Sequence, residues 1–195
     1  FEKFSYIINS YSFCNFLTLQ KMEEVATTAM PVLETAASVN WGFILSIVGA
    51  LFAVVLGGMG SSIGIKTAGQ KAAGVLAEKP NMFGSLVTMV VLPGSQGIYG
   101  LLIAIMILNK IGAMSGELVE LTVGNGIAFL LAGLIIGILG LVSAMFQGRV
   151  VAAAIGGLAR DESIFGGAIT MSVLIETYAI FGLLISIFIT GAALS

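Results

Sequence analysis

Residues 167–190 read GAITMSVLIETYAIFGLLISIFIT. This run is long enough to cross the apolar core of a bilayer, which takes roughly 20 helical residues. Glu176 is its only charged residue. A carboxylate near the middle of a spanning helix is costly and rare, and such groups usually handle ions or protons. The stretch therefore predicts a membrane helix that carries a functional acid.

The composition of the whole chain is typical of an integral membrane protein. Hydrophobic residues make up 58% of it and charged residues 9%, against about 25% charged residues in soluble domains. Mean hydropathy is +1.10. Three further apolar runs of similar length cover residues 41–65, 83–108 and 126–146. We expect an all-α membrane protein with four transmembrane helices and little or no soluble domain.

Several function classes are excluded by the residues that the chain lacks. It has no histidine, and Cys14 is its only cysteine. That excludes a disulfide framework, the usual zinc patterns and a histidine-based catalytic triad. No GxxxxGK[ST] motif occurs, so we expect no ATP site and no catalysis in this chain. The net charge of -2 gives no indication of nucleic-acid binding.

The sequence repeats itself without gaps at a fixed shift. Residues 76–84, LAEKPNMFG, align with residues 158–166, LARDESIFG, so the shift is 158 minus 76, or 82. The repeat predicts two tandem-duplicated hairpins of the same orientation, a parallel duplication. Because 176 minus 82 is 94, the first hairpin has Gly94 where the second has Glu176. Each copy of the chain would thus carry one ionisable site per four helices.

The repeat and the apolar runs divide the chain into four parts. These are an N-terminal segment (1–40), a first hairpin (41–110), a connecting loop (111–125) and a second hairpin with the acid (126–195). Residues 1–21 are aromatic and polar, without a clear signal-peptide pattern. Met22 opens an ordinary start, so we expect residues 1–21 to be non-native or upstream of the true start. An atypical N-terminal extension is the alternative.

The distribution of Lys and Arg residues predicts which side of the membrane each end of the hairpins faces. The expected hairpin loops, residues 66–80 and 149–162, hold five Lys and Arg residues, and the other side, counted from Met22, holds only Lys110, where the first hairpin meets the connecting loop. The positive-inside rule then puts both loops in the cytoplasm and both termini outside.

Glycine pairs predict close helix packing. Gly60 and Gly64 form one GxxxG pair, and Gly133 and Gly137 form another, followed by Gly140. Small residues let helix backbones approach closely in lipid. These faces suit a tight inner ring of helices, with packing inside one monomer as the alternative.

Few polar residues lie at membrane depth, and those present are rich in oxygen. Pro93 breaks the hydrogen-bond ladder and frees carbonyls that a cation can use. Ser95, Gln96 and Gln147 add neutral oxygens to the charge of Glu176. Such a set suits a hard monovalent cation, whereas zinc prefers His or Cys. Taken alone, Ser95 and Gln96 also fit interhelical hydrogen bonding, and Gln147 also fits a helix cap.

Three segments carry a family resemblance. LPGSQGIYG (92–100), FQGRVVAAA (146–154) and LIETYAIFG (174–182) resemble the proteolipid ring subunit, K or c, of V-type ATPases, above all the sodium-translocating bacterial form. The resemblance covers residues 41–190. It implies a cyclic rotor ring of identical subunits in the cell membrane that couples ion flow to rotation.

The resemblance also implies a ligand set for Na+. Leu92 would give a backbone carbonyl, Ser95 a hydroxyl, Gln96 and Gln147 amide oxygens, and Glu176 a carboxylate. Ser95 stands where the family often has Thr. Tyr99 matches a tyrosine that hydrogen-bonds the glutamate and locks it, although an aromatic packing role is open from the residues alone.

The same resemblance implies the partners of the ring. These are a stator membrane subunit with an essential arginine, a central-stalk subunit at the cytoplasmic loops, surrounding lipid, and separate ATP-binding subunits. Three alternatives remain at this stage: the same ring coupled to H+, a non-rotary proteolipid channel, and a small multidrug-type exporter.

Overall fold

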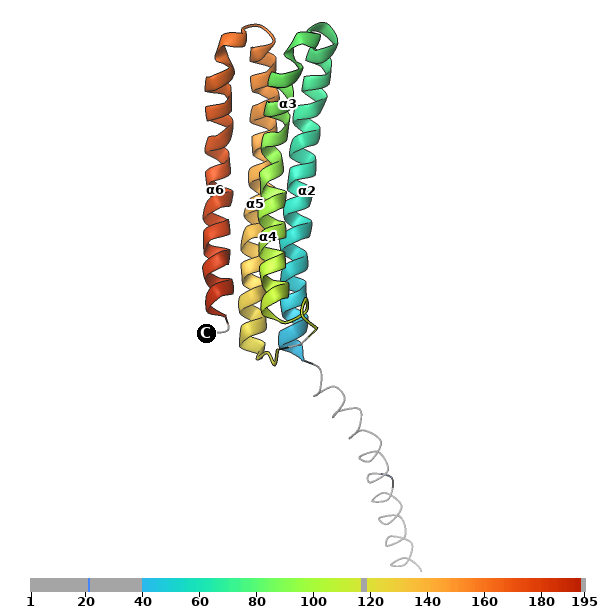
Figure 1. Ribbon diagram of the computed structural model, residues 1–195, viewed down its shortest axis with the longest axis vertical. Helices are drawn as coiled ribbons and strands as arrows, with labels where there is room; N and C mark the ends of the chain where they lie inside the picture. The colour runs from blue at the N-terminus through green and yellow to red at the C-terminus, as the bar shows by residue number, and fades with distance from the viewer. Residues whose placement is uncertain (1–20, 22–39, 117–118, 194–195) are drawn as a thin grey trace, which may run out of the picture. The chain divides into compact units, whose positions relative to one another are not determined.

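Four long helical spans lie side by side in the computed structural model (Figure 1). The structure describes residues 21, 40–116 and 119–193. The expectations about residues 1–21 and a start at Met22 fall, apart from Lys21, outside these ranges. The elements in chain order are α2 (Trp41–Glu78), η1 (Pro80–Met82), α3 (Phe83–Val91), η2 (Leu92–Gly94), α4 (Ser95–Lys110), α5 (Val123–Leu158), η3 (Glu162–Ile164) and α6 (Phe165–Ala192).

The predicted architecture is confirmed. Four candidate spans are long and apolar enough to cross a membrane, namely Trp41–Glu78, Pro80–Lys110, Val123–Leu158 and Glu162–Ala192. No strand occurs in the described ranges. The turns of both hairpins lie at one end of the bundle, and α2 begins and α6 ends at the other (Figure 1).

The predicted hairpin loops, residues 66–80 and 149–162, are wrong in extent. Helix α2 continues to Glu78 and α5 to Leu158, so the turns between helices shrink to Lys79 and residues 159–161. The apolar runs predict the length of each helix that lies in the apolar core of the bilayer. A helix can continue beyond that length with a polar exposed face, as α2 and α5 do. Gln147 consequently lies well inside α5, which ends at Leu158, and does not cap it.

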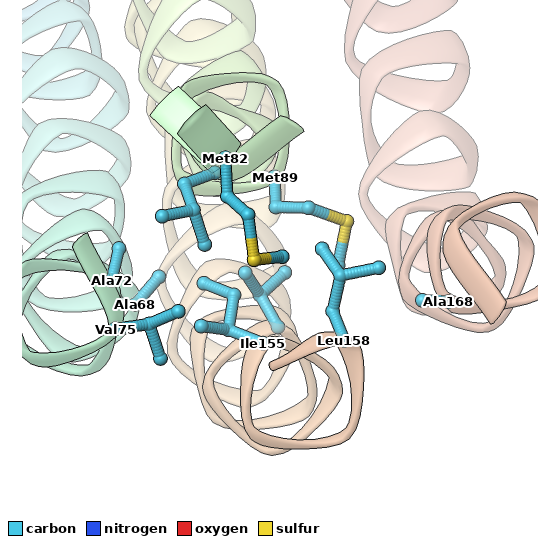
Figure 2. Close-up of a cluster of buried hydrophobic side chains, with 10 residues drawn as sticks. Ala68, Ala72, Val75, Met82, Met89, Ile155, Leu158 and Ala168 are labelled. Atoms are coloured by element: carbon cyan, nitrogen blue, oxygen red, sulfur yellow. The ribbon is translucent and has the colours of Figure 1, made fainter. Parts of the chain in front are cut away.

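A hydrophobic cluster explains why the helices continue beyond the apolar runs. Figure 2 shows Met82 and Met89 reaching toward Ile155 and Leu158 of α5, beside Ala68, Ala72 and Val75 of α2. Met82, Met89, Ile155 and Leu158 are almost fully buried. One face of each extension thus packs in this cluster while Lys66, Lys71 and Arg149 lie on exposed faces.

Side-chain caps fix three of the starts. The Asn40 side chain accepts a hydrogen bond from the backbone N–H of Phe43 at 3.0 Å, and Thr122 accepts one from Asn125 N–H at 3.2 Å. Asp161 accepts the backbone N–H of Ser163 at 2.9 Å before η3. Hydrogen bonds from the hydroxyl and backbone N–H of Ser163 hold the pKa of the Asp161 carboxyl below its usual value.

The helices pack through small residues and turn large ones outward. The buried residues of α6 are all small or polar: Ala168, Ser172, Glu176, Ala179, Gly182, Ser186 and Thr190. Its exposed residues include Leu174, Phe181 and Phe188. This is the reverse of a soluble bundle, as expected where lipid tails solvate large apolar side chains and helices associate by close packing.

Backbone contact between α2 and α5 uses most of the predicted glycines inside one monomer. A Cβ at Gly133 would lie 1.9 Å from the carbonyl oxygen of Gly49, and one at Gly64 would lie 2.4 Å from that of Ala144. Gly42 faces Gly126 and Gly64 faces Gly148, so the two helices keep the same register at both ends of the contact. From Gly42 to Gly64 the contact follows α2 for about 33 Å at a rise of about 1.5 Å per residue.

We expect Gly49→Ala to destabilise the fold by about 1–3 kcal/mol or more, because the added Cβ would lie 2.5 Å from the carbonyl oxygen of Phe129 and α2 would have to move away from α5. Thermal unfolding of the purified protein in detergent measures the effect. Gly74→Ala is the matched control in the same helix, since its Cβ meets nothing within 4 Å and alanine favours helix by up to about 1 kcal/mol. Equal stability of the two variants would contradict the packing argument.

Candidate functional site

Glu176 lies in the buried stripe of α6, where that helix faces α4 and α5. Its side chain is only 9% exposed. The hydroxyl of Tyr99, from α4, donates to Glu176 Oε1 at 2.6 Å. The amide of Gln147, from α5, donates to Glu176 Oε2 at 3.4 Å and to the Ser172 carbonyl at 3.2 Å. Three helices therefore hold the carboxylate.

A second amide extends the network away from the carboxylate. Gln96 Nε2, from α4, donates to Gln147 Oε1 at 2.7 Å. The Ser95 hydroxyl lies 3.3 Å from Gln96 Oε1 and 3.2 Å from the Leu92 carbonyl oxygen. Gln96 and Gln147 are both fully buried. The structure thus brings the five sequence-predicted ligands and Tyr99 into one hydrogen-bonded chain.

The break in the second span has the form that Pro93 dictates. The 3-10 turn η2, Leu92–Gly94, separates α3 from α4, because proline removes a donor and clashes with the preceding turn. Pro93 packs against α2, where a Cβ on Gly64 would lie 2.6 Å from Pro93 Cβ. The turn presents the Leu92 carbonyl beside Ser95.

Two serines close to the site were missed in the sequence. Ser61 of α2 accepts the backbone N–H of Gly97 at 2.8 Å and lies 3.3 Å from the Gly94 carbonyl, bridging the broken ladder. Ser143 of α5 donates to the Ile175 carbonyl at 3.0 Å. The repeat marks them as equivalent positions, because 143 minus 82 is 61, but it does not say what they contact. Each serine bonds a main-chain carbonyl on the second helix of its own hairpin.

The oxygen atoms gathered at this site are suited to bind a hard monovalent cation. It offers one carboxylate, two amide oxygens, a hydroxyl and a main-chain carbonyl, whereas zinc prefers nitrogen and sulfur. Within the described ranges, no group of three or more His, Cys, Asp or Glu side chains could hold a metal. The negative charge of the site therefore comes from Glu176 alone.

Comparison with known proteins gives a family and several relatives. A family model for the C subunit of ATP synthase matches residues 48–107 and again residues 130–189. The second match begins 82 positions after the first (130 minus 48), so the two matches confirm the tandem repeat.

Similar proteins carry related names. The A-type ATP synthase subunit K of Methanocaldococcus jannaschii is 47% identical over 74% of this chain and 60% of its own length. The V-type sodium ATPase subunit K of Enterococcus hirae is 35% identical over 75% of this chain and 90% of its own. The 16 kDa proteolipid of the V-type proton ATPase of Nephrops norvegicus is 27% identical over 73% and 87%.

We expect Tyr99→Phe to speed the reaction of Glu176 with dicyclohexylcarbodiimide about tenfold. The loss of a hydrogen bond to a charged group, worth about 1.5–3 kcal/mol, frees the carboxyl to leave its pocket. Mass spectrometry of the labelled protein gives the rate. Tyr178→Phe is the control, because Tyr178 is 65% exposed and its ring meets Phe181 edge-on. Equal rates in the two variants would show that Tyr99 does not restrain the carboxyl.

Proposed function

The chain belongs to the ATP synthase C family, and on that premise we propose that it is a rotor-ring subunit that carries Na+ on Glu176 and couples its passage to ring rotation. The observation that supports this most is the set of neutral oxygens gathered around one membrane-embedded carboxylate. Gln96 and Gln147, fully buried, lie in the same hydrogen-bonded chain as Glu176.

The amides favour Na+ over H+ as the transported ion. A proton carrier needs only the carboxylate and an apolar surround, and buried polar groups are costly unless they are paired or used. Two glutamines and a serine beside Glu176 are explained if their oxygens replace the water around a cation. The sodium ATPase named for the Enterococcus hirae relative agrees with this choice, while the proton ATPase of Nephrops norvegicus makes H+ the second candidate.

Neutralisation of Glu176 is the basis of the mechanism. With Na+ bound, the carboxylate has lost its net charge and the site can pass through lipid as the ring turns. A bare carboxylate is too costly to expose there, so it has to meet a fixed positive charge. We assign that charge to an arginine of a stator subunit, since Arg160 lies at the hairpin turn and Arg149, although close to Gln147 in sequence, is exposed and lies over the ring of Phe146.

The position of Glu176 on the least buried of the four spans supports exchange at the edge of the bundle. Helix α6 packs on α5 and α4 and belongs to the least buried of the four spans. In the most apolar stretch of that span 22% is buried, against 44% in the span Val123–Leu158. The carboxylate itself is held by Tyr99 and Gln147, and Glu176 is 9% exposed. A short rotation of its side chain would bring it to a partner subunit.

The surroundings of the ring follow from the same proposal. Identical copies form a closed cyclic assembly, and separate subunits bind ATP. The basic residues at the hairpin end support an orientation with that end in the cytoplasm and both termini outside. The central stalk would meet Lys79, η1, residues 159–161 and η3 together with the helix ends beside them, because the connections there are short.

Competition between Na+ and carbodiimide tests the proposed ion. Purified ring is labelled across a range of pH with added Na+ or K+, and modification of Glu176 is followed by mass spectrometry. We expect millimolar Na+ to block labelling and K+ to leave it unchanged, because both the reagent and Na+ need the same carboxyl. Strong labelling that is indifferent to Na+ would identify a proton carrier and overturn the sodium assignment.

We expect Glu176→Gln to abolish ATP-driven Na+ uptake by vesicles that contain the whole complex, while the ring still assembles. The amide keeps the size of the side chain and removes the charge that binds the cation. The control is Glu120→Gln, an exposed carboxylate between α4 and α5 at the end of the bundle opposite the hairpin turns, which should transport normally. Normal uptake by Glu176→Gln would exclude Glu176 as the carrier.

A further inference from the structure

We propose that Ser143 is a positioning residue that fixes which way round the Gln96 amide lies, and so sets the affinity of the site for its cation. This inference rests on the cation-binding function proposed above. Ser143 lies on α5, one helical turn before Gln147, and is 4% exposed. It touches Gln96 but lies outside the expected ligand set.

The hydrogen bonds of Ser143 leave only one role for its oxygen toward Gln96. A serine hydroxyl has one proton to donate and lone pairs to accept. Ser143 donates to the Ile175 carbonyl at 3.0 Å, and a carbonyl cannot donate in return. The Ser143 oxygen therefore presents only lone pairs to Gln96, and the group that faces it at 3.3 Å is the amide nitrogen Nε2.

The amide orientation follows from this constraint. Gln96 Nε2 donates one proton to Ser143 Oγ at 3.3 Å and the other to Gln147 Oε1 at 2.7 Å. Gln96 Oε1 is then turned toward the Ser95 hydroxyl, 3.3 Å away, on the side of the expected ligands Leu92 and Ser95. A flipped amide would place its oxygen against the lone pairs of Ser143 and Gln147 and lose both bonds.

Helix α6 orients both amides through its own main chain. The Ser172 carbonyl accepts Gln147 Nε2 directly at 3.2 Å. The Ile175 carbonyl acts on Gln96 through Ser143. Ile175 directly precedes Glu176 in α6. The helix that carries the charge therefore also fixes the orientation of both amides, with Gln96 Nε2 facing Gln147 Oε1.

The first hairpin shows what the equivalent serine does when it bonds only main-chain groups. Ser61, the repeat equivalent of Ser143, lies 3.3 Å from the Gly94 carbonyl and accepts the backbone N–H of Gly97. There the residue only joins two helices. In the second hairpin the same link to a carbonyl is kept, and the accepting side of the hydroxyl serves Gln96 instead of a backbone group.

The test measures how much Na+ is needed to halve carbodiimide labelling of Glu176 in the purified ring. We expect Ser143→Ala to raise that concentration about tenfold, because the amide loses a bond that selects one orientation, worth about 1.4 kcal/mol. The labelling rate without Na+ should change less than twofold. Ser143→Cys, nearly isosteric and a weaker hydrogen-bonding group, should shift half-protection in the same direction by less, and it keeps the test valid if the alanine variant fails to assemble.

Ser186→Ala is the matched control. Ser186 is fully buried and donates across the same helix pair, to the Ala132 carbonyl at 2.8 Å, far along α6 from Gln96. It should leave half-protection unchanged while it removes an interhelical bond of the same kind. If Ser143→Ala and Ser143→Cys match Ser186→Ala, Ser143 only joins helices and the inference fails.

A double-mutant cycle with Gln96→Ala tests whether Ser143 acts through Gln96. In the Gln96→Ala background, Ser143→Ala should cause no further rise in the Na+ needed, and an independent, additive rise would contradict the inference. The wild-type ring separates the two proposals. If Na+ does not protect Glu176 from labelling in the wild-type ring, the sodium function itself is refuted. If Na+ protects the wild-type ring and the Ser143 variants equally well, only the role of Ser143 is refuted.

Discussion

The close approach of α2 and α5 is the contact on which the rest of the structure depends. In lipid there is little hydrophobic gain from burying one apolar side chain against another, so helices associate through close packing and hydrogen bonds. The glycines of α2 and α5 bring two backbones into direct contact over most of the span. Helices α4 and α6 then pack on the sides of this pair, and Gln96, Gln147 and Glu176 meet where the three helices α4, α5 and α6 adjoin.

A membrane interior also decides how polar groups are arranged. Each unpaired polar group there costs free energy, and among the side-chain nitrogen and oxygen atoms in the part of the chain that the structure describes only Thr190 Oγ1 is buried without a partner. The polar side chains of the site satisfy one another through a chain of donors that runs from Tyr99 and the two amides to Ser143 and the carbonyls of α6. Such a chain fixes orientation, because reversing one amide would break the bonds of its neighbours. The carboxylate that this chain holds lies on the least buried of the four spans.

The two hairpins contribute different residues to the site. Both keep a serine that bonds the next helix, Ser61 in the first and Ser143 in the second. The first hairpin supplies the break at Pro93 and the neutral oxygens of Ser95 and Gln96, while Ile175 and Glu176 take the positions of Pro93 and Gly94 in the second. The kink and the charge thus lie at equivalent depths in different halves. That is why one copy of the chain builds one site.

The sequence by itself determined the fold class, the four spans, the tandem repeat and the acid, since the hydropathy of a membrane-length run and a lone membrane carboxylate are local properties. It also pointed to the residues that the tertiary structure gathers around Glu176. It misplaced the ends of α2 and α5, because helix length depends on packing in the cluster around Met82 and Ile155 as well as on apolar composition. Only the tertiary structure decided which faces Gly60 and Gly133 use, that Ser61 bonds the main chain at Gly94 and Gly97, and that Ser143 joins the network around Glu176. Such contacts depend on the relative rotation and offset of helices that are distant in the chain, and no local pattern of residues specifies these.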